Sequence, residues 1–247
     1  MKDDGLSGRL AVVTGAASGI GRAAALALAA AGARIAVVDR DEIGGADACA
    51  AIRASGSDGI FMAADLTDDA SIRAAAEAIG VPDVLVNAAG WDRLEPFVEN
   101  SFAFMEEIVR LNLLGPVKLT RLLLPAMLEA GRGKIVNVAS DAGRVGSTGE
   151  TVYAGAKGGI IAFTKSLARE VARAGINVNC VCPGPTDTPL FQSLPEKMRQ
   201  ALERAIPFRR LARPDEVADA IVFFSGSGSA FITGQVLSVS GGLTMAG

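Results

Sequence analysis

The 247-residue sequence predicts a single α/β domain in which a parallel sheet is covered by helices on both faces. Two observations support this prediction. Short, almost entirely apolar runs alternate along the chain with longer helical stretches, and such runs are typical of strands buried on both sides of a sheet. The length fits one α/β domain, and the chain contains no solenoid-period repeat or linker. We therefore expect residues 1–247 to form one domain.

The chain begins with a strand, a glycine turn and a helix. The strand is the apolar run Leu10–Val13, which ends in Thr14-Gly15. The helix is the alanine- and leucine-rich stretch Arg22–Ala31, which Gly32 closes. The apolar runs that follow predict the remaining strands, Arg34–Asp39, Gly59–Ala64, Val84–Asn87, Lys134–Ala139, Asn177–Val181 and Gly234–Val239.

Helical stretches separate these strands, namely Asp69–Ala78, Ser101–Ala130, Tyr153–Ala174 and Asp215–Phe224. The proline-rich segment from Pro183 to Pro214 follows neither pattern. Long irregular segments in compact domains are often lids, so we expect a substrate lid around residues 185–214.

The turn after the first strand has the pattern of a dinucleotide-binding site. Thr14–Gly21 contains three glycines, which let the backbone approach a pyrophosphate, and the helix N-terminus that follows supplies N–H donors. Asp39 comes 24 residues after Gly15, at the end of the second strand, where a carboxylate accepts hydrogen bonds from an adenosine ribose. The pattern predicts a Rossmann-type, doubly wound sheet that binds NAD. NADP is the less favoured alternative, because Asp39 repels a 2′-phosphate although Arg40 beside it attracts one.

Composition excludes several classes of protein. The absence of histidine excludes Ser-His-Asp hydrolysis and histidine-containing zinc sites, and no catalytic metal is expected. Lys and Arg total 24 against 27 Asp and Glu, without a basic stripe, so nucleic acid is not an expected partner. The acidic start Met1–Asp4 lacks a signal-peptide pattern, and the apolar stretch between Arg22 and Arg34 is too short to cross a bilayer. We expect a cytoplasmic protein with no membrane partner.

A tyrosine and a lysine offer the acid–base chemistry that histidine would otherwise supply. Tyr153 is the only tyrosine, and Lys157 lies four residues later on the same face of a predicted helix. A phenol has an ordinary pKa of about 10, and a nearby ammonium in a partly desolvated cleft lowers that pKa toward neutrality. Ser140 follows the strand Lys134–Ala139, at the end where open α/β sheets bind ligands. Its hydroxyl is expected to hold the substrate oxygen beside Tyr153.

From Leu6-Ser7-Gly8 to Gly241-Gly242 the sequence resembles the short-chain dehydrogenase/reductases. The resemblance rests on motifs that occur in the family's order, namely Thr14–Gly21, Asp65-Leu66, Asn87–Gly90, Asn112, Ser140, Tyr153–Lys157 and Pro183-Gly184. It implies hydride transfer between a secondary alcohol or ketone and the cofactor. It also implies that Ser140 orients the substrate and that Tyr153 is the acid–base group. Lys157 is then expected to lower the pKa of the phenol and bind the nicotinamide ribose, and Asn112 to join a proton relay.

The same resemblance implies a set of cofactor contacts, namely Gly15, Ser18, Gly19, Ile20, Gly21, Asp39, Asp65, Leu66, Asn87, Ala88, Gly90, Tyr153, Lys157, Pro183, Gly184, Thr186 and Thr188. Within this set, Asp65 resembles the residue that meets the adenine, and Asn87–Gly90 the wall beside the adenosine ribose. Thr188 resembles a contact to the nicotinamide carboxamide. Each has a structural alternative, since Asp65 could cap a helix, Asn87 could pin a turn and Thr188 could be an ordinary loop residue.

The loops and the lid, rather than the fold, determine which substrate binds. Trp91, Arg144 and Glu150 are the candidate substrate residues. The C-terminal half resembles the 2-hydroxycyclohexanecarboxyl-CoA dehydrogenases within the family, which implies a cyclic 3-hydroxyacyl-CoA substrate. Residues 195–214 include six basic and two acidic side chains, a local charge of +4 that suits the phosphates of CoA and suits a solvated surface equally well.

Two other functions stay open. A 3-oxoacyl-carrier-protein reductase has the same fold, but Asp39 disfavours it because reductive biosynthesis in this family usually draws on NADPH. A non-catalytic NAD-binding protein is the rival from another class, and the complete set Asn112, Ser140, Tyr153 and Lys157 speaks against it. The resemblance further implies a homotetramer packed through the helices Ser101–Ala130 and Tyr153–Ala174 and the C-terminal strand region.

Overall fold

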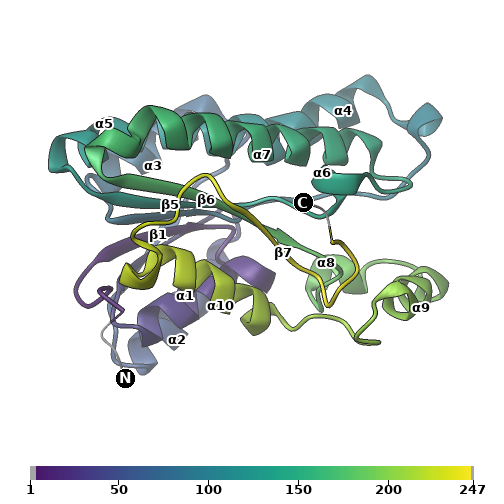
Figure 1. Ribbon diagram of the computed structural model, residues 1–247, viewed down its shortest axis with the longest axis horizontal. Coiled ribbons are helices and arrows are strands. Elements are labelled where there is room, and N and C mark those ends of the chain that lie inside the picture. Colours follow the sequence, from purple (N-terminus) through teal and green to yellow (C-terminus); the bar gives the residue numbers. More distant parts are fainter. Residues whose placement is uncertain (1–3, 246–247) are drawn as a thin grey trace.

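A seven-stranded parallel sheet forms the centre of the computed structural model, which describes residues 4–245 (Figure 1). The start of the acidic segment and the last two residues lie outside this range. The strand order is β3-β2-β1-β4-β5-β6-β7, and all neighbouring pairs are parallel. The strands are β1 Leu10–Thr14, β2 Arg34–Asp39, β3 Gly59–Ala63, β4 Val84–Asn87, β5 Gly133–Val138, β6 Ile176–Pro183 and β7 Val236–Val239. The predicted single-domain, doubly wound fold is confirmed in these residues.

Helices cover both faces of the sheet (Figure 1). One face carries α1 Gly19–Ala30, α2 Glu42–Ala54 and α10 Pro214–Ser225, and the other carries α3 Asp69–Ile79, α4 Phe102–Val109, α5 Gly115–Ala130 and α7 Thr151–Val171. Three further helices, α6 Ala142–Val145, α8 Pro189–Gln192 and α9 Glu196–Ala205, lie toward one end of the sheet. The chain winds outward from β1 to β3 and then returns to β4, so the order reverses between β1 and β4. Ligands of open α/β sheets bind at such a switch point, beyond the carboxyl ends of the strands.

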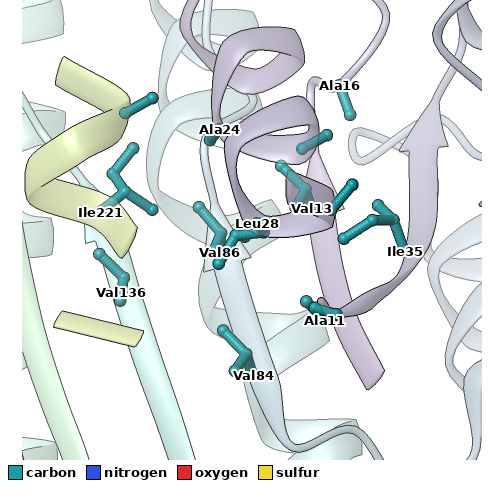
Figure 2. Close-up of a cluster of buried hydrophobic side chains, with 14 of the residues drawn as sticks. Ala11, Val13, Ala16, Ala24, Leu28, Ile35, Val84, Val86, Val136 and Ile221 are labelled. Atoms are coloured by element: carbon teal, nitrogen blue, oxygen red, sulfur yellow. The ribbon is translucent and has the colours of Figure 1, made fainter. Parts of the chain in front are cut away.

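The alternation of side chains along β1 explains why its sequence is continuously apolar. Ala11 and Val13 are buried on the face that α1 and α10 cover, together with Leu28 and Ile221 (Figure 2). Val12 is buried on the opposite face, in the cluster under α3, α5 and α7. Fully burying one valine or leucine side chain contributes roughly 1.5–3 kcal/mol to stability. Both faces of each central strand therefore need apolar residues.

The sequence pattern does not single out α2, because Gly44 and Gly45 stand near its start. A Cβ atom at Gly45 would lie 2.0 Å from Cε2 of Phe61 on β3. Glycine at this position therefore lets α2 approach the sheet. Glycine also has a low helix propensity, so the sequence pattern of α2 is weak.

The predicted helix Ser101–Ala130 is interrupted by a π-helical segment, Arg110–Leu114, between α4 and α5. The whole stretch Phe102–Ala130 is long and apolar enough to cross a membrane. The sequence-based argument against a membrane span considered only residues 22–34. Here α5 packs against α3 and β5, as a helix of the α/β layer. Short π segments inside helices occur frequently at functional sites.

The segment expected to be irregular forms two helices, α8 and α9. Two of its prolines lie at the starts of these helices, with Pro189 in the first turn of α8 and Pro195 at the N-cap of α9. Proline is compatible with these positions because the first helical N–H groups have no partner within the helix. Thr188 caps α8 by accepting a hydrogen bond from the Phe191 N–H.

Candidate active site

A cavity of about 900 Å³ lies at the carboxyl ends of the strands. The glycine turn, the loops after β4 and β5, the start of α7 and the α8–α9 segment all contribute to its wall. The predicted site residues on this wall are Gly15, Ser18, Gly19, Ile20, Gly21, Asp39, Asp65, Leu66, Ala88, Gly90, Trp91, Ser140, Glu150, Tyr153, Lys157, Pro183, Gly184, Thr186 and Thr188. The cavity therefore brings together positions that are up to 173 residues apart in the sequence.

The glycine turn combines close backbone packing with an open surface. A Cβ atom at Gly21 would lie 2.1 Å from the carbonyl oxygen of Gly15, so only glycine lets this turn close. Gly19 has a φ of +53°, and a Cβ atom there would meet only the Thr188 side chain, at 3.4 Å. Ser18, at the N-cap of α1, makes no side-chain capping hydrogen bond. The first amides of α1 are thus placed to donate to an anionic group in the cavity.

Asp39 joins the end of β2 to the glycine turn. Its Oδ2 accepts a hydrogen bond from the Ala17 N–H at 2.9 Å, and its Oδ1 accepts one from the Asp41 N–H at 3.0 Å. A carboxylate oxygen can accept more than one hydrogen bond, so both oxygens can still receive hydroxyl donors. These residues fit the ribose and pyrophosphate of a dinucleotide, while Arg40 lines the same region.

Ser140 and Tyr153, the predicted reactive pair, both lie on the cavity wall. Ser140 follows β5, and its Oγ accepts a hydrogen bond from the Ala142 N–H at 3.1 Å. Its hydroxyl also hydrogen-bonds the phenol of Tyr153, which lies in the first turn of α7. The two oxygens therefore face one region, where a substrate oxygen could bind both of them.

Lys157 lies one helical turn beyond Tyr153 and is almost completely buried. Its Nζ donates a hydrogen bond to the Val138 carbonyl at 3.0 Å and lies 5.6 Å from the centroid of the Tyr153 ring. Burial lowers the pKa of Lys157 to about 8, although the nearby thiols of Cys180 and Cys182 act in the opposite direction.

The expected depression of the Tyr153 pKa is wrong. Burial, followed by the negative charges of Glu150 and Asp92, raises the pKa of the phenol above its ordinary value, and only the Ser140 hydrogen bond opposes them. The reason is that the ammonium of Lys157 is itself desolvated and held by a backbone carbonyl, while the charges of two carboxylates act on the phenol.

Asn112 lies at the centre of the π segment and ties it to the loop after β4. Its Nδ2 donates to the carbonyls of Trp91 at 2.8 Å and Ile108 at 3.0 Å, and its Oδ1 accepts from the Trp91 N–H at 3.3 Å. A Cβ atom at Gly90 would lie 2.8 Å from Asn112 Oδ1 and 3.2 Å from Lys157 Nζ. Gly90 thus marks the place where the predicted relay residues approach each other.

Comparison with known proteins gives the same class of protein as the geometry of the cavity. The family model described as enoyl-(acyl carrier protein) reductase matches residues 15–244. Cis-4-hydroxycyclohexanecarboxylate dehydrogenase of Sinomonas cyclohexanicum is 41% identical over 242 residues, which cover 96% of each chain. The chain belongs to the short-chain dehydrogenase/reductase family. It is an oxidoreductase that acts on CH–OH groups.

Two further members of the short-chain dehydrogenase/reductase family show how broad the similarity is. The 3-oxoacyl-[acyl-carrier-protein] reductase FabG of Pseudomonas aeruginosa is 37% identical over 97% of this chain and 99% of its own. A crystal structure from Beutenbergia cavernae, assigned as an NAD(P)-dependent gluconate 5-dehydrogenase with NADP bound at low occupancy, has a TM-score of 0.94. It is 34% identical and covers 98% of both chains.

Three predicted site residues of this dehydrogenase/reductase do not line the cavity. Asn112 acts behind the wall, as described above. The Asn87 side chain is buried within the sheet, where its Nδ2 donates to Thr120 and Asn137. Arg144 donates to the Ser238 hydroxyl, which in turn donates to Asp141. The Nδ2 of Asn87 and the guanidinium of Arg144 are therefore directed to protein partners, while Asn87 Oδ1 is buried without a hydrogen-bond partner within the described residues.

Asp65 and Thr188 line the cavity and also organise the local backbone. The carboxylate of Asp65 accepts hydrogen bonds from the backbone and side chain of Thr67, while Asp68 caps the helix that follows. Burial raises the pKa of Asp65, but the hydrogen bonds from Thr67 and the charge of Arg40 outweigh it, so the pKa is lowered overall.

Sequence reasoning missed Asp92. This residue follows Trp91, lines the cavity and is only 6% exposed. The signal in the sequence was a charged residue directly after a motif at the carboxyl end of a strand, a place that often carries function.

Proposed function

We propose that this protein is an NAD-dependent dehydrogenase that oxidises a secondary alcohol on a ring, in a cyclic 3-hydroxyacyl-CoA such as 2-hydroxycyclohexanecarboxyl-CoA. The observation that carries the proposal is the pairing of Ser140 with Tyr153 on the wall of a cavity that also contains Asp39 and the glycine turn. The identity to a hydroxycyclohexanecarboxylate dehydrogenase supports a ring substrate. The complete catalytic set disfavours a protein that only binds a dinucleotide.

Each residue of the catalytic set is given a separate role in the reaction. Ser140 holds the substrate oxygen, and Tyr153 removes the hydroxyl proton as the alcohol becomes a ketone. When bound, the nicotinamide supplies the acceptor for the hydride that leaves the carbon, and its positive charge favours the phenolate. Lys157 and Asn112 are proposed to pass the proton from Tyr153 toward solvent. Tyr153 needs the positive charge of the nicotinamide because burial and two carboxylates favour the neutral phenol.

The choice of NAD rests on Asp39. Its carboxylate lies at the end of β2 and is held by two backbone N–H groups, so it is fixed where a ribose would bind. A 2′-phosphate there would meet a negative charge at short range. Arg40 lines the same region and would attract a 2′-phosphate. Because of this arginine and the similarity to FabG, 3-oxoacyl-carrier-protein reduction is the second candidate function.

The α8–α9 segment is proposed to be the substrate lid. Met198, Ala201 and Leu202 on α9 line the cavity, so its inner face is apolar and suits a ring. Arg210 forms an ion pair with Glu216, and Arg213 forms ion pairs with Asp215 and Glu216, which removes much of the basic character expected for the segment. Four basic side chains of the segment form no ion pair within residues 4–245, but Arg199 donates to Gln192 and Arg209 to the Arg204 carbonyl. Lys197 and Arg204 are therefore our candidates for the phosphates of CoA.

Truncation of the substrate tests the thioester proposal. We expect kcat/KM for 2-hydroxycyclohexanecarboxyl-CoA to exceed that for the N-acetylcysteamine thioester of the same acid. The double substitution Lys197→Ala/Arg204→Ala should reduce the advantage of the CoA thioester and leave the truncated thioester unaffected, whereas Arg213→Ala should change neither. Equal turnover of both thioesters by the unmodified protein would contradict CoA recognition.

The assembly and the location of the protein are also proposals. Exposed apolar side chains gather where the resemblance places tetramer contacts, with Phe102 at the start of α4 and Phe231 before β7. Large exposed apolar groups often mark protein interfaces. A homotetramer in the cytoplasm is consistent with these surfaces and with a dinucleotide cofactor.

A further inference from the structure

Two carboxylic acids lie on the cavity wall close to Tyr153. Asp92 belongs to the loop after β4, and Glu150 occupies the N-cap of α7, three residues before Tyr153. Both charges act on the phenol and raise its pKa. The two acids therefore face the same region as the reactive pair, although they come from segments 58 residues apart.

The loops that carry these acids are fixed to each other. The Glu95 N–H donates a hydrogen bond to the Gly149 carbonyl at 3.1 Å. The Trp91 backbone is held by Asn112, and the Trp91 ring packs edge-on against Phe104 with centroids 6.1 Å apart. The loop around Asp92 is thus held by the contacts of Trp91, which precedes it, and of Glu95, which follows it.

Asp92 is buried without a cation to neutralise it. Its Oδ2 has no hydrogen-bond partner within the described residues. The adjacent Arg93 is directed elsewhere, because its guanidinium pairs with Glu95 at 2.8 Å and lies 4.6 Å from the Phe104 ring centroid. A buried polar group without a partner is costly, and in a native structure it needs an explanation.

The surroundings favour the protonated acid. Burial first, and then the charges of Glu150 and Glu95, raise the pKa of Asp92 to about 7, whereas the Arg93 N–H and the Arg93 charge act in the opposite direction. Burial also raises the pKa of Glu150, which only a hydrogen bond from Ser147 opposes. Near neutral pH the pair therefore contains both a proton to donate and a negative charge.

We propose that Asp92 and Glu150 form a recognition pair that hydrogen-bonds a neutral polar substituent of the substrate, an ester or thioester carbonyl, and rejects a free carboxylate. The inference rests on the proposed function for the class of substrate. A protonated acid donates to a carbonyl oxygen, whereas a carboxylate in the same place would meet the remaining negative charge in a desolvated site. The pair would thus make the enzyme select the activated acid over the free acid.

Matched substrates without CoA test the proposal directly. We would compare kcat/KM for methyl 2-hydroxycyclohexanecarboxylate and 2-hydroxycyclohexanecarboxylate. We expect the unmodified protein to favour the ester by at least about tenfold at pH 7, which corresponds to about 1.4 kcal/mol. The preference should shrink at pH 6, where the pair is more protonated. Asp92→Asn and Glu150→Gln should each reduce the preference by improving turnover of the acid. Glu99→Gln, which removes an exposed carboxylate that does not line the cavity, should leave the ratio unchanged.

A binding measurement separates this inference from the proposed function. Trp91 is the only tryptophan and lies on the cavity wall, so its fluorescence reports binding of methyl cyclohexanecarboxylate and of cyclohexanecarboxylate without turnover. Tighter binding of the ester, lost in Asp92→Asn, would support the pair even if no cyclic alcohol were oxidised. Equal binding of ester and acid, or an unchanged ratio in both variants, would overturn it even if the CoA thioester were turned over.

Discussion

Tyr153 experiences opposing influences in this protein. Its hydroxyl hydrogen-bonds Ser140, which favours the phenolate, while burial and the charges of Glu150 and Asp92 favour the neutral phenol. A neutral phenol suits reduction of a ketone, since it can donate a proton. Oxidation of an alcohol requires the phenolate, so the balance at this residue determines how the enzyme responds to pH.

Removal of the phenolic oxygen tests the assignment of Tyr153. Tyr153→Phe should reduce kcat by about 10²- to 10⁴-fold, the range for loss of a general acid–base group. Cofactor binding, followed by Trp91 fluorescence, should persist because the ring remains. Comparable turnover by the variant would mean that another group transfers the proton.

Lys157 gives a prediction about stability and pH. Its pKa is lowered to about 8 in the folded protein, whereas in the unfolded chain it has the ordinary value of about 10.4. Between these pH values the unfolded chain binds more protons, so the free energy of unfolding rises with pH because of this group. Lys157→Met should flatten that rise in urea unfolding between about pH 8 and 10.

The matched control is Lys165→Met, which removes an exposed lysine from the same helix. It should keep the slope of the unmodified protein. Identical slopes for the unmodified protein and Lys157→Met would show that burial does not depress this pKa.

At the scale of elements, the π segment between α4 and α5 connects packing to function. Its Asn112 amide makes two hydrogen bonds with the Trp91 backbone, in the loop after β4, and a third with the Ile108 carbonyl of α4. A regular helix through the same residues would move this side chain away from that loop.

Asn112→Ala should therefore lower the free energy of unfolding by about 1–3 kcal/mol, since buried backbone groups lose their partners. It should also shift the Trp91 emission, because the loop is released. Leu114→Ala, at an exposed position of the same segment, should cause a smaller loss and leave Trp91 unchanged. An unaltered emission in Asn112→Ala would contradict the role of this contact.

The sequence predicted the central elements well and the side-chain directions less well. Strands such as Arg34–Asp39 were correct because the buried parallel sheet requires continuous apolar runs. The π segment could not be predicted, since residues 101–130 keep one helical pattern throughout. Asn87 ends β4 and Arg144 lies in α6, but their side-chain orientation depends on partners such as Asn137 and Ser238 that are distant in the sequence.

For the whole molecule, exposed apolar side chains are the basis of the proposed self-association. Phe102 is 84% exposed and Phe231 is fully exposed, which is unfavourable for a protein that remains a monomer. Both lie in regions where the family resemblance places subunit contacts. A closed symmetric assembly would bury these side chains on every subunit.

Light scattering coupled to size exclusion should give about four times the chain mass of 25.2 kDa. Phe102→Glu/Phe231→Glu should shift the mass toward dimers or monomers, because the charges would be buried in the interfaces. Ile43→Glu, at an equally exposed position on α2, should leave the mass unchanged. A monomer in the unmodified protein would refute the tetramer.

We propose that the carboxylate of Asp39 and the Ser140–Tyr153 pair make this molecule an NAD-dependent alcohol dehydrogenase. The most direct test is the absorbance of reduced nicotinamide when the protein is mixed with 2-hydroxycyclohexanecarboxyl-CoA and either NAD or NADP. We predict turnover with NAD at a kcat/KM at least about tenfold above that with NADP, a difference of about 1.4 kcal/mol. Equal or better turnover with NADP would contradict the role given to Asp39, and the absence of turnover with both cofactors would contradict the proposed substrate.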